Sequence, residues 1–253
     1  MKTNLHRLKI IFSIILFVFS VPAYPRLFTI IANPQAPHKY IEKGGAKGID
    51  IEVIGHVLDR LHIKYKLKFI KSDARIVQEA KAGRADMILL LSKNESRLQY
   101  LHYPKESYID IRWNFFILKE NAGTINYNSF ADLKGLRVGI TNNISYTPAF
   151  LHADLDFDRV SKNELQIKKL LNKRIDIVPL NTISTLYEAE TQGYTDKLAY
   201  LPKLLKSKAY YNAFCIASQH PDKQKVMAHY DQMIRELKDE KIIAGILDKY
   251  LKN

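Results

Sequence analysis

The sequence predicts an α/β fold of two lobes, each built from a mostly parallel sheet flanked by helices. In the first half of the chain, apolar runs with strand periodicity alternate with runs of helical periodicity, which is typical of parallel sheets. After Tyr108 the pattern changes, which indicates a crossing into a second unit. A short internal similarity supports two lobes. Residues 84–88 (Arg-Ala-Asp-Met-Ile) and 174–178 (Arg-Ile-Asp-Ile-Val) each follow a predicted helix and begin a predicted strand, although five residues can also match by chance.

The first 23 residues have the pattern of an export signal. A basic start with Lys2, Arg7 and Lys9 precedes an apolar run over residues 10–21, and Ala23 ends a small-residue site of the kind that signal peptidase cleaves. The apolar run is shorter than the roughly 20 residues that a transmembrane helix needs. We therefore expect cleavage after Ala23 and release of a soluble protein into the periplasm. An uncleaved membrane anchor is the alternative.

Charge and cysteine content limit the class of protein. Loss of three of the 39 Lys and Arg residues with the signal would leave 36 against 26 acidic residues, a net charge of +10. The basic residues are scattered and no basic-aromatic motif occurs, so we expect no nucleic-acid partner and an anionic small molecule instead. Cys215 is the only cysteine, which argues against a small disulfide-stapled scaffold.

The elements of the first lobe follow from periodicity. In chain order they are a strand over 27–32, a helix over 48–61, a strand over 63–69, a helix capped by Asp73, and a strand over 87–91. Parallel α/β sheets bind ligands at the carboxyl ends of their strands. Arg97 follows the last of these strands, and its planar guanidinium suits a carboxylate or phosphate. The alternative is a surface arginine at the start of a helix.

The second half predicts a further α/β unit and a return to the first. Its expected elements are an extended segment over 113–118, a short helix over 130–135, a strand over 137–141, a polar loop over 142–147, a helix over 164–171 and a strand over 175–180. Residues 194–205 are expected to be a connector, 210–218 a returning strand, and 223–251 helical. No hydrolase, phosphate-loop or zinc motif occurs, so we expect no enzyme activity, no metal and no cofactor.

Several short segments resemble, in order and spacing, motifs of the family 3 periplasmic solute-binding proteins, the amino-acid-binding components of ABC importers. These segments are 48–52 (GIDIE), 82–88 (AGRADMI), 92–97 (SKNESR) with 101–103 (LHY), and 132–139 (DLKGLRVG). The resemblance implies the type II periplasmic binding fold. Lobe 1 would comprise residues 24–117 and 216–253, and lobe 2 residues 118–215. Two hinge strands would join the lobes, which would close on a ligand.

The resemblance also implies a set of ligand contacts. Arg97 would hold the ligand's carboxylate, Ser92 would help to bind its amino group, and Trp113 would form a wall or pack at the hinge. The remaining implied contacts are two aromatic loop positions, His38 and Tyr40, a second-lobe turn that includes Asn143, Ser145 and Tyr146, and the strand-end residue Asn181.

Three residues, at two places in the chain, depart from the family pattern. Asn181 stands where relatives that bind α-amino acids have an acidic residue, and a neutral amide cannot pair with a buried ammonium group as a carboxylate does. Leu90 and Leu91 replace a pair of small residues. We therefore expect an anionic or zwitterionic small molecule, held mainly by Arg97.

Three functions remain open at this point. The first is a monomeric solute-binding protein that serves an ABC-type permease. The second is an exported dehydratase-like enzyme acting on a prephenate-like acid, with Glu95 or Glu106 as its general acid. The third is a sensory or accessory module for a membrane partner, which the sequence does not separate from transport.

Overall fold

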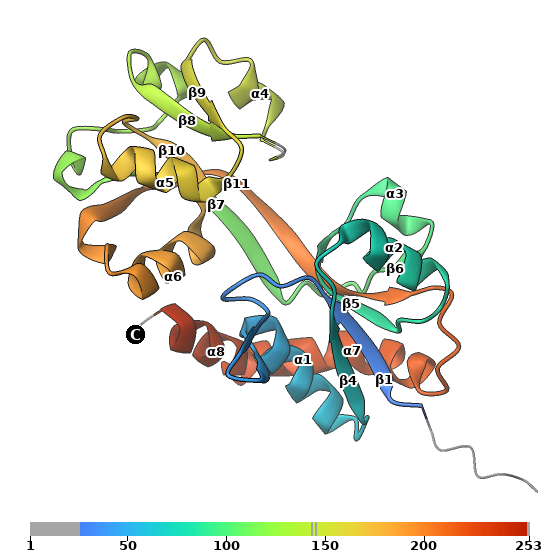
Figure 1. Cartoon of the computed structure of the whole chain (residues 1–253). Coiled ribbons are helices and arrows are strands. Elements are labelled where there is room, and N and C mark those ends of the chain that lie inside the picture. The colour runs from blue at the N-terminus through green and yellow to red at the C-terminus, as the bar shows by residue number, and fades with distance from the viewer. Residues whose placement is uncertain (1–25, 143, 145, 252–253) are drawn as a thin grey trace, which may run out of the picture.

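Two α/β lobes are joined by two long strands in the structure, a computed structural model that describes residues 26–142, 144 and 146–251 (Figure 1). The joining strands are β7 (Ile109–Leu118) and β11 (Leu198–Cys215), which pair antiparallel. They lie inside one sheet of order β10-β7-β11-β5-β1-β4, with β6 also paired to β11, so the sheet continues through both lobes. The predicted lobe borders, 117/118 and 215/216, fall at the ends of these strands and stay a prediction.

The lower lobe in Figure 1, lobe 1, contains the predicted parallel strands. β1 (Phe28–Ala32) pairs in parallel with β4 (Tyr65–Phe69) on one side and with β5 (Met87–Ser92) on the other. The remaining elements of this lobe are the hairpin β2 (Tyr40–Glu42) and β3 (Gly45–Lys47), the short strand β6 (Leu101–His102), and the helices α1 (Ile49–Arg60), α2 (Asp73–Lys81), α3 (Glu95–Leu98), α7 (Lys223–Asp239) and α8 (Ile242–Leu251).

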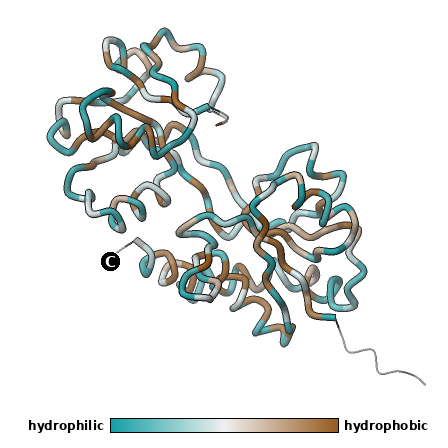
Figure 2. Tube along the Cα trace, viewed as in Figure 1, coloured by the Kyte–Doolittle hydropathy of each residue, from teal (hydrophilic) through white to brown (hydrophobic). Residues whose placement is uncertain are grey.

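Helices cover both faces of the lobe 1 sheet. The first face packs on α1, α7 and α8, where Tyr230 of α7 is fully buried. The second face packs on α2, through Ile76 and Ala80. Figure 2 shows the apolar stretches concentrated in the central strands of this lobe, with polar residues on the outer turns. Cys215 is buried in the second cluster, and burial raises the pKa of its thiol to about 12.

Lobe 2 is a smaller unit of the same kind. The parallel pair β8 (Arg137–Thr141) and β9 (Asp156–Val160) lies beside β10 (Val178–Asn181), which in turn pairs with β7. Its helices are α4 (Pro148–Leu151), α5 (Asn163–Leu171) and α6 (Thr182–Gln192), with 3-10 turns η1 (Lys119–Asn121), η2 (Phe130–Leu133) and η3 (Thr195–Lys197). An aromatic cluster around Phe150 fills one side of the sheet, and α5 and α6 cover the other.

Several predicted elements need correction. The connector predicted over 194–205 lies largely within β11, which begins at Leu198; Pro202 and two register shifts hide its strand periodicity. The helical end is two helices, because Lys241 adopts a left-handed conformation with φ of 59° between α7 and α8. The cap of α2 is Ser72 rather than Asp73, since the Ser72 side chain accepts the Arg75 N–H.

No helix in the described part of the chain is both long and apolar enough to cross a membrane.

Candidate functional site

Three neighbouring parallel strands end at one edge of lobe 1 and deliver polar residues there. Asp73 follows β4, Gln35 follows β1, and Arg97 follows β5. Because carboxyl ends of adjacent parallel strands meet at the same edge, residues that are far apart in the sequence converge. These three side chains line one cavity of about 250 Å³. The other lining residues are Asn33, Ile76, Val77, Ile88, Leu90, Leu91, Ser92, Tyr100 and Tyr210.

Arg97 is held in place by the end of its own strand. It lies in the short helix α3, where the Asn94 side chain accepts its backbone N–H at 3.0 Å. Its Nη1 donates to the carbonyl oxygen of Ser92 at 2.7 Å and to the Ser92 hydroxyl at 3.2 Å. Tyr103 donates to the same carbonyl at 3.0 Å. These contacts orient the guanidinium, and Arg97 forms no ion pair with any residue that the structure describes.

Leu90 forms part of the cavity wall in an unusual conformation. Its φ is 56°, in the left-handed region that costs a non-glycine residue about 1–2 kcal/mol. The pairing of β11 with β5 shifts register here, and the buried Asn212 side chain accepts the Leu90 N–H at 3.3 Å. The side chain of Leu90 is 5% exposed, so it adds an apolar surface beside Ser92. Strain beside a cavity is a common feature of binding sites.

The opposing wall belongs to lobe 2. A second cavity, of about 430 Å³, lies between the loop at Gln35 and Ala36 and residues along α6 and at the start of α5. Gln35 lines both cavities, which therefore adjoin. The lobe 2 residues of this lining are Asn163, Glu164, Asn181, Ser184, Tyr187, Glu188 and Thr191. Burial, together with the charge of Glu164, raises the pKa of Glu188.

Asn181 lies at this wall and caps α6. Its Oδ1 accepts the backbone N–H of Ser184 at 3.0 Å, so the side-chain oxygen already has a hydrogen-bond partner within α6. The amide of Asn181 thus has a structural role at the start of the helix.

The other predicted contacts lie in different surroundings. His38 is fully buried within lobe 1, with Nδ1 3.5 Å from a carboxylate oxygen of Asp50, and it does not line the cavities described above. Tyr146 is 7% exposed, and its hydroxyl accepts the Thr141 N–H at 2.9 Å within the lobe 2 core. Asn143 and Ser145 lie outside the described residues.

Tyr40 and Trp113 lie where the two lobes meet. The Tyr40 hydroxyl accepts a hydrogen bond of 3.3 Å from Tyr187 of α6, so this pair links the hairpin of lobe 1 to lobe 2. Trp113 lies in β7 opposite Lys206 of β11, whose ammonium group is 4.1 Å from the centre of the indole ring. Burial lowers the pKa of Lys206, and its neighbour Lys208 lowers it further.

Sequence reasoning missed Gln35, Asp73 and Tyr210 as cavity residues. A signal for Asp73 was present, because it follows a predicted strand, but the residue was interpreted as a helix cap. Tyr210 comes from the antiparallel strand β11 and pairs opposite Ser92. Only this long-range pairing brings it to the cavity.

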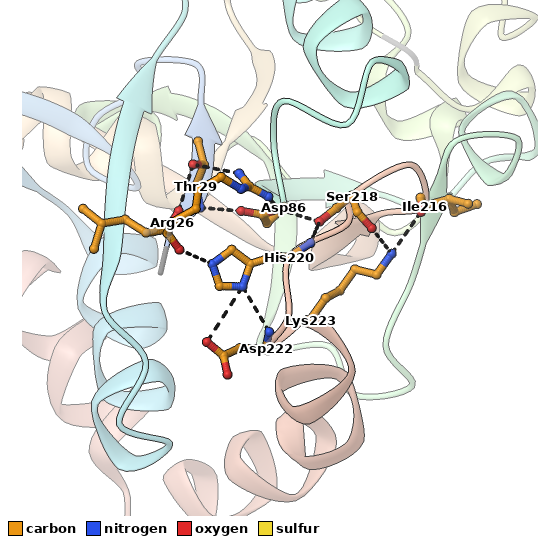
Figure 3. Close-up of polar contacts among 9 residues, drawn as sticks. Arg26, Thr29, Asp86, Ile216, Ser218, His220, Asp222 and Lys223 are labelled. Carbon is orange, nitrogen blue, oxygen red and sulfur yellow. Dashed lines mark hydrogen bonds and ion pairs between the residues drawn. The ribbon is translucent and has the colours of Figure 1, made fainter. Parts of the chain in front are cut away.

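A Ser-His-Asp group lies at the opposite end of lobe 1 and is structural (Figure 3). The His220 ring contacts the carbonyl oxygen of Arg26 through Nε2 and accepts the Asp222 N–H through Nδ1. Ser218 donates its hydroxyl to the buried Asp86. Since both ring nitrogens are engaged by backbone groups, the histidine does not activate the serine, and the network ties β1, β5 and the end of β11 together.

The predicted general acids are poorly placed for acid catalysis. Glu106 pairs with Lys238 and Arg235 of α7, and the hydrogen bond from Lys238 holds the pKa of this carboxyl below its ordinary value. Glu95 lies exposed in α3. No group of three metal-ligating side chains occurs among the described residues.

Comparison with solved structures shows the same two-lobed fold. The second substrate-binding domain of GlnP from Lactococcus lactis, in an open conformation, is 21% identical, with 90% of this chain and 97% of that chain covered and a TM-score of 0.71. The unliganded, open L-cystine solute receptor of Neisseria gonorrhoeae is 17% identical, with 89% and 93% covered and a TM-score of 0.69. The GluR0 ligand-binding core of Nostoc punctiforme, in complex with L-glutamate, is 16% identical, with 89% and 100% covered and a TM-score of 0.62.

No curated protein sequence matches the chain. The family comparison, in contrast, matches residues 28–253, nearly the whole chain that follows the predicted signal. With the type II periplasmic binding fold, this match shows that the chain belongs to the bacterial extracellular solute-binding proteins, family 3.

Proposed function

We propose that the protein captures a small carboxylate-bearing ligand, such as an amino acid or a related acid, in the cleft between its lobes. The observation that carries the proposal is the oriented guanidinium of Arg97, which lines a partly apolar cavity at the carboxyl edge of the lobe 1 sheet. A guanidinium that pairs with no described carboxylate offers bidentate donors to an acidic ligand. The solved relatives that carry L-glutamate or take L-cystine support a ligand of this size and class.

The cleft walls support capture by closure. Gln35 borders cavities that reach Arg97 on lobe 1 and Asn181 on lobe 2, so a ligand bound at Arg97 lies near the second lobe. The connection through β7 and β11 is of the kind that permits hinge motion. In this proposal the ligand first binds to lobe 1, and lobe 2 then closes over it.

We also propose export to the periplasm and service to an ABC-type importer. The export pattern of residues 1–23 and the family of extracellular proteins support the compartment. The likeness to domains of amino-acid transporters supports transport. A sensory role uses the same cleft, and the neighbouring genes discriminate: a permease with an ATPase favours import, whereas a kinase favours sensing.

Arg97→Ala tests the proposed binding site. A panel of amino acids and other small acids is first screened by thermal shift against the wild type, because a ligand that binds only the native state raises the Tm. Loss of a charge-assisted hydrogen bond costs about 1.5–3 kcal/mol, so the variant should bind the responding acid at least about tenfold more weakly.

Arg174→Ala is the matched control, since it removes the same charge from an exposed position in lobe 2. It should leave affinity unchanged. Unchanged affinity in Arg97→Ala, or a dominant response of the wild type to a neutral sugar, contradicts the proposal.

A further inference from the structure

The lobe 1 cavity carries two charged side chains of opposite sign. Among the described residues that line it, Arg97 and Asp73 are the only charged ones. They follow β5 and β4, which lie on either side of β1 in the sheet. The lining around them mixes apolar side chains, such as Ile76 and Leu90, with polar ones. The cavity thus offers an anion site and a cation site in a lining that is apolar in part.

The carboxylate of Asp73 is available to a ligand. Ser72 caps α2 in its place, so Asp73 does not satisfy the free N–H groups of that helix. Asp73 forms no ion pair and no side-chain hydrogen bond with any described residue. The buried ammonium of Lys39 lies within the field of Asp73, but the carboxylate within 4.0 Å of it is that of Asp50. Burial lowers the pKa of Lys39, which favours its neutral form.

The strand end of lobe 2 does not supply this negative charge. Asn181 is neutral, and its Oδ1 accepts the N–H of Ser184. Glu164 and Glu188 also line the lobe 2 wall, but they border the cavity beside Gln35 and Ala36 rather than the one that contains Arg97. An ammonium group close to a carboxylate bound at Arg97 therefore finds its anionic partner in lobe 1.

We propose that Asp73 binds the cationic group of the ligand, so that lobe 1 alone holds both charges of a zwitterionic or cationic amino acid. This inference rests on the proposed function, and it makes Asp73 a specificity-determining residue. An acid without an amino group would leave the Asp73 carboxylate desolvated and unpaired when the lobes close, which disfavours that acid.

The test compares amino acids with the acids that lack their amino group. L-leucine is titrated beside isocaproate, L-valine beside isovalerate, and L-phenylalanine beside hydrocinnamate, all by calorimetry on the full exported chain. The wild type should bind the amino acid of the responding pair more tightly than its partner. Asp73→Asn should lower that preference at least about tenfold, because the lost contact is a charge-assisted hydrogen bond. Asp73→Glu should keep part of it.

Asp239→Asn, which removes an exposed carboxylate at the end of α7, is the matched control and should keep the full preference. A purely structural role of Asp73 at the first turn of α2 would lower the Tm of the free protein without changing the preference. An unchanged preference in Asp73→Asn, with binding still lost in Arg97→Ala, overturns the role of Asp73 and leaves the proposed function standing. Loss of the preference in Glu164→Gln or Glu188→Gln, with the preference kept in Asp73→Asn, also overturns the role of Asp73. If none of the three pairs responds, the pair is built from the acid that responds in the thermal-shift panel. A wild type that binds no acid of that panel overturns both proposals.

Discussion

Asp86 and Asp176 share two kinds of bond in the two lobes, a backbone N–H and a guanidinium. Oδ2 of Asp86 accepts the Thr29 N–H at 2.6 Å, and Oδ1 accepts from the Arg26 guanidinium. In lobe 2, Oδ2 of Asp176 accepts the Arg137 N–H at 2.8 Å, and Oδ1 accepts from the guanidinium of the same residue. In both lobes the aspartate fixes the start of the neighbouring strand. The five-residue internal similarity therefore corresponds to a repeated structural unit.

Asp176→Asn should make the stability depend less on pH. The hydrogen bonds from Arg137 hold the pKa of Asp176 below its ordinary value of about 3.9. A carboxyl whose pKa is lower in the folded state stabilises the fold above its unfolded pKa and loses that contribution as the pH falls through its folded pKa. Because Arg137 is half-exposed, we expect a loss of only about 1 kcal/mol at about pH 7, shrinking toward zero below about pH 4.

Urea unfolding of the wild type and of Asp176→Asn, at neutral pH and in acid, measures this difference in the free energy of unfolding. Asp154→Asn is the control, since Asp154 forms an exposed ion pair with Lys134 that should contribute little. A difference between wild type and Asp176→Asn that persists in acid would show that the lost stability does not come from the charge of Asp176.

The ends of α2 and α5 show how an element can be repeated with different residues. Each helix ends in a left-handed residue, Gly83 with φ of 67° and Lys173 with φ of 57°. In lobe 1 only glycine fits, because a Cβ atom at Gly83 would lie 2.4 Å from the carbonyl oxygen of Ala217, just beyond β11. This close approach joins the end of α2 to the end of the returning strand.

Gly83→Ala should destabilise the protein more than Gly193→Ala. Both glycines have positive φ, and alanine costs about 1–2 kcal/mol in that conformation. A Cβ atom at Gly193 would meet open space, whereas one at Gly83 would collide with the Ala217 carbonyl. Such overpacking adds about 1–3 kcal/mol. Thermal unfolding of the two variants side by side isolates the contact. Equal losses of stability in the two variants would mean that the backbone at Ala217 moves aside at no energetic cost.

The arrangement of the two lobes depends on buried asparagines in the joining strands. Asn114 of β7 is 3% exposed, and its Nδ2 donates to the carbonyl of Leu201 at 2.8 Å, where β11 departs from regular pairing. Its Oδ1 accepts from the Thr182 hydroxyl at 2.6 Å, at the start of α6. One amide thus connects the hinge to the lobe 2 wall of the cleft. In lobe 1, the side chain of Asn212 in β11 accepts the Leu90 N–H and so connects the returning strand to the cavity wall.

Asn114→Ala should destabilise the hinge region by about 1–3 kcal/mol. The substitution leaves the buried Leu201 carbonyl without its side-chain donor, and one buried unsatisfied group costs about that much. The Thr182 hydroxyl loses its amide acceptor but can still donate to the Arg112 carbonyl at 3.1 Å. Urea unfolding followed by Trp113 emission reports on the adjacent residue, and circular dichroism reports on the whole chain. Asn172→Ala, which removes an exposed amide just after the end of α5, is the control and should change little. Equal effects of the two substitutions would contradict this role of Asn114.

Local sequence determined the identity of most elements and the position of Arg97. Periodicity alone distinguishes α1 from β4, and a polar loop after a buried strand places Arg97 at a sheet edge. Tertiary structure decided which side chains share the cavity. The pairing order β4-β1-β5 brings Asp73 to Arg97, and the antiparallel return of β11 adds Tyr210. The tertiary structure also buries His38 in the interior of lobe 1 and Tyr146 in the core of lobe 2. Local periodicity specifies the face of an element but not its neighbour, because strand pairing depends on contacts between residues far apart in the chain.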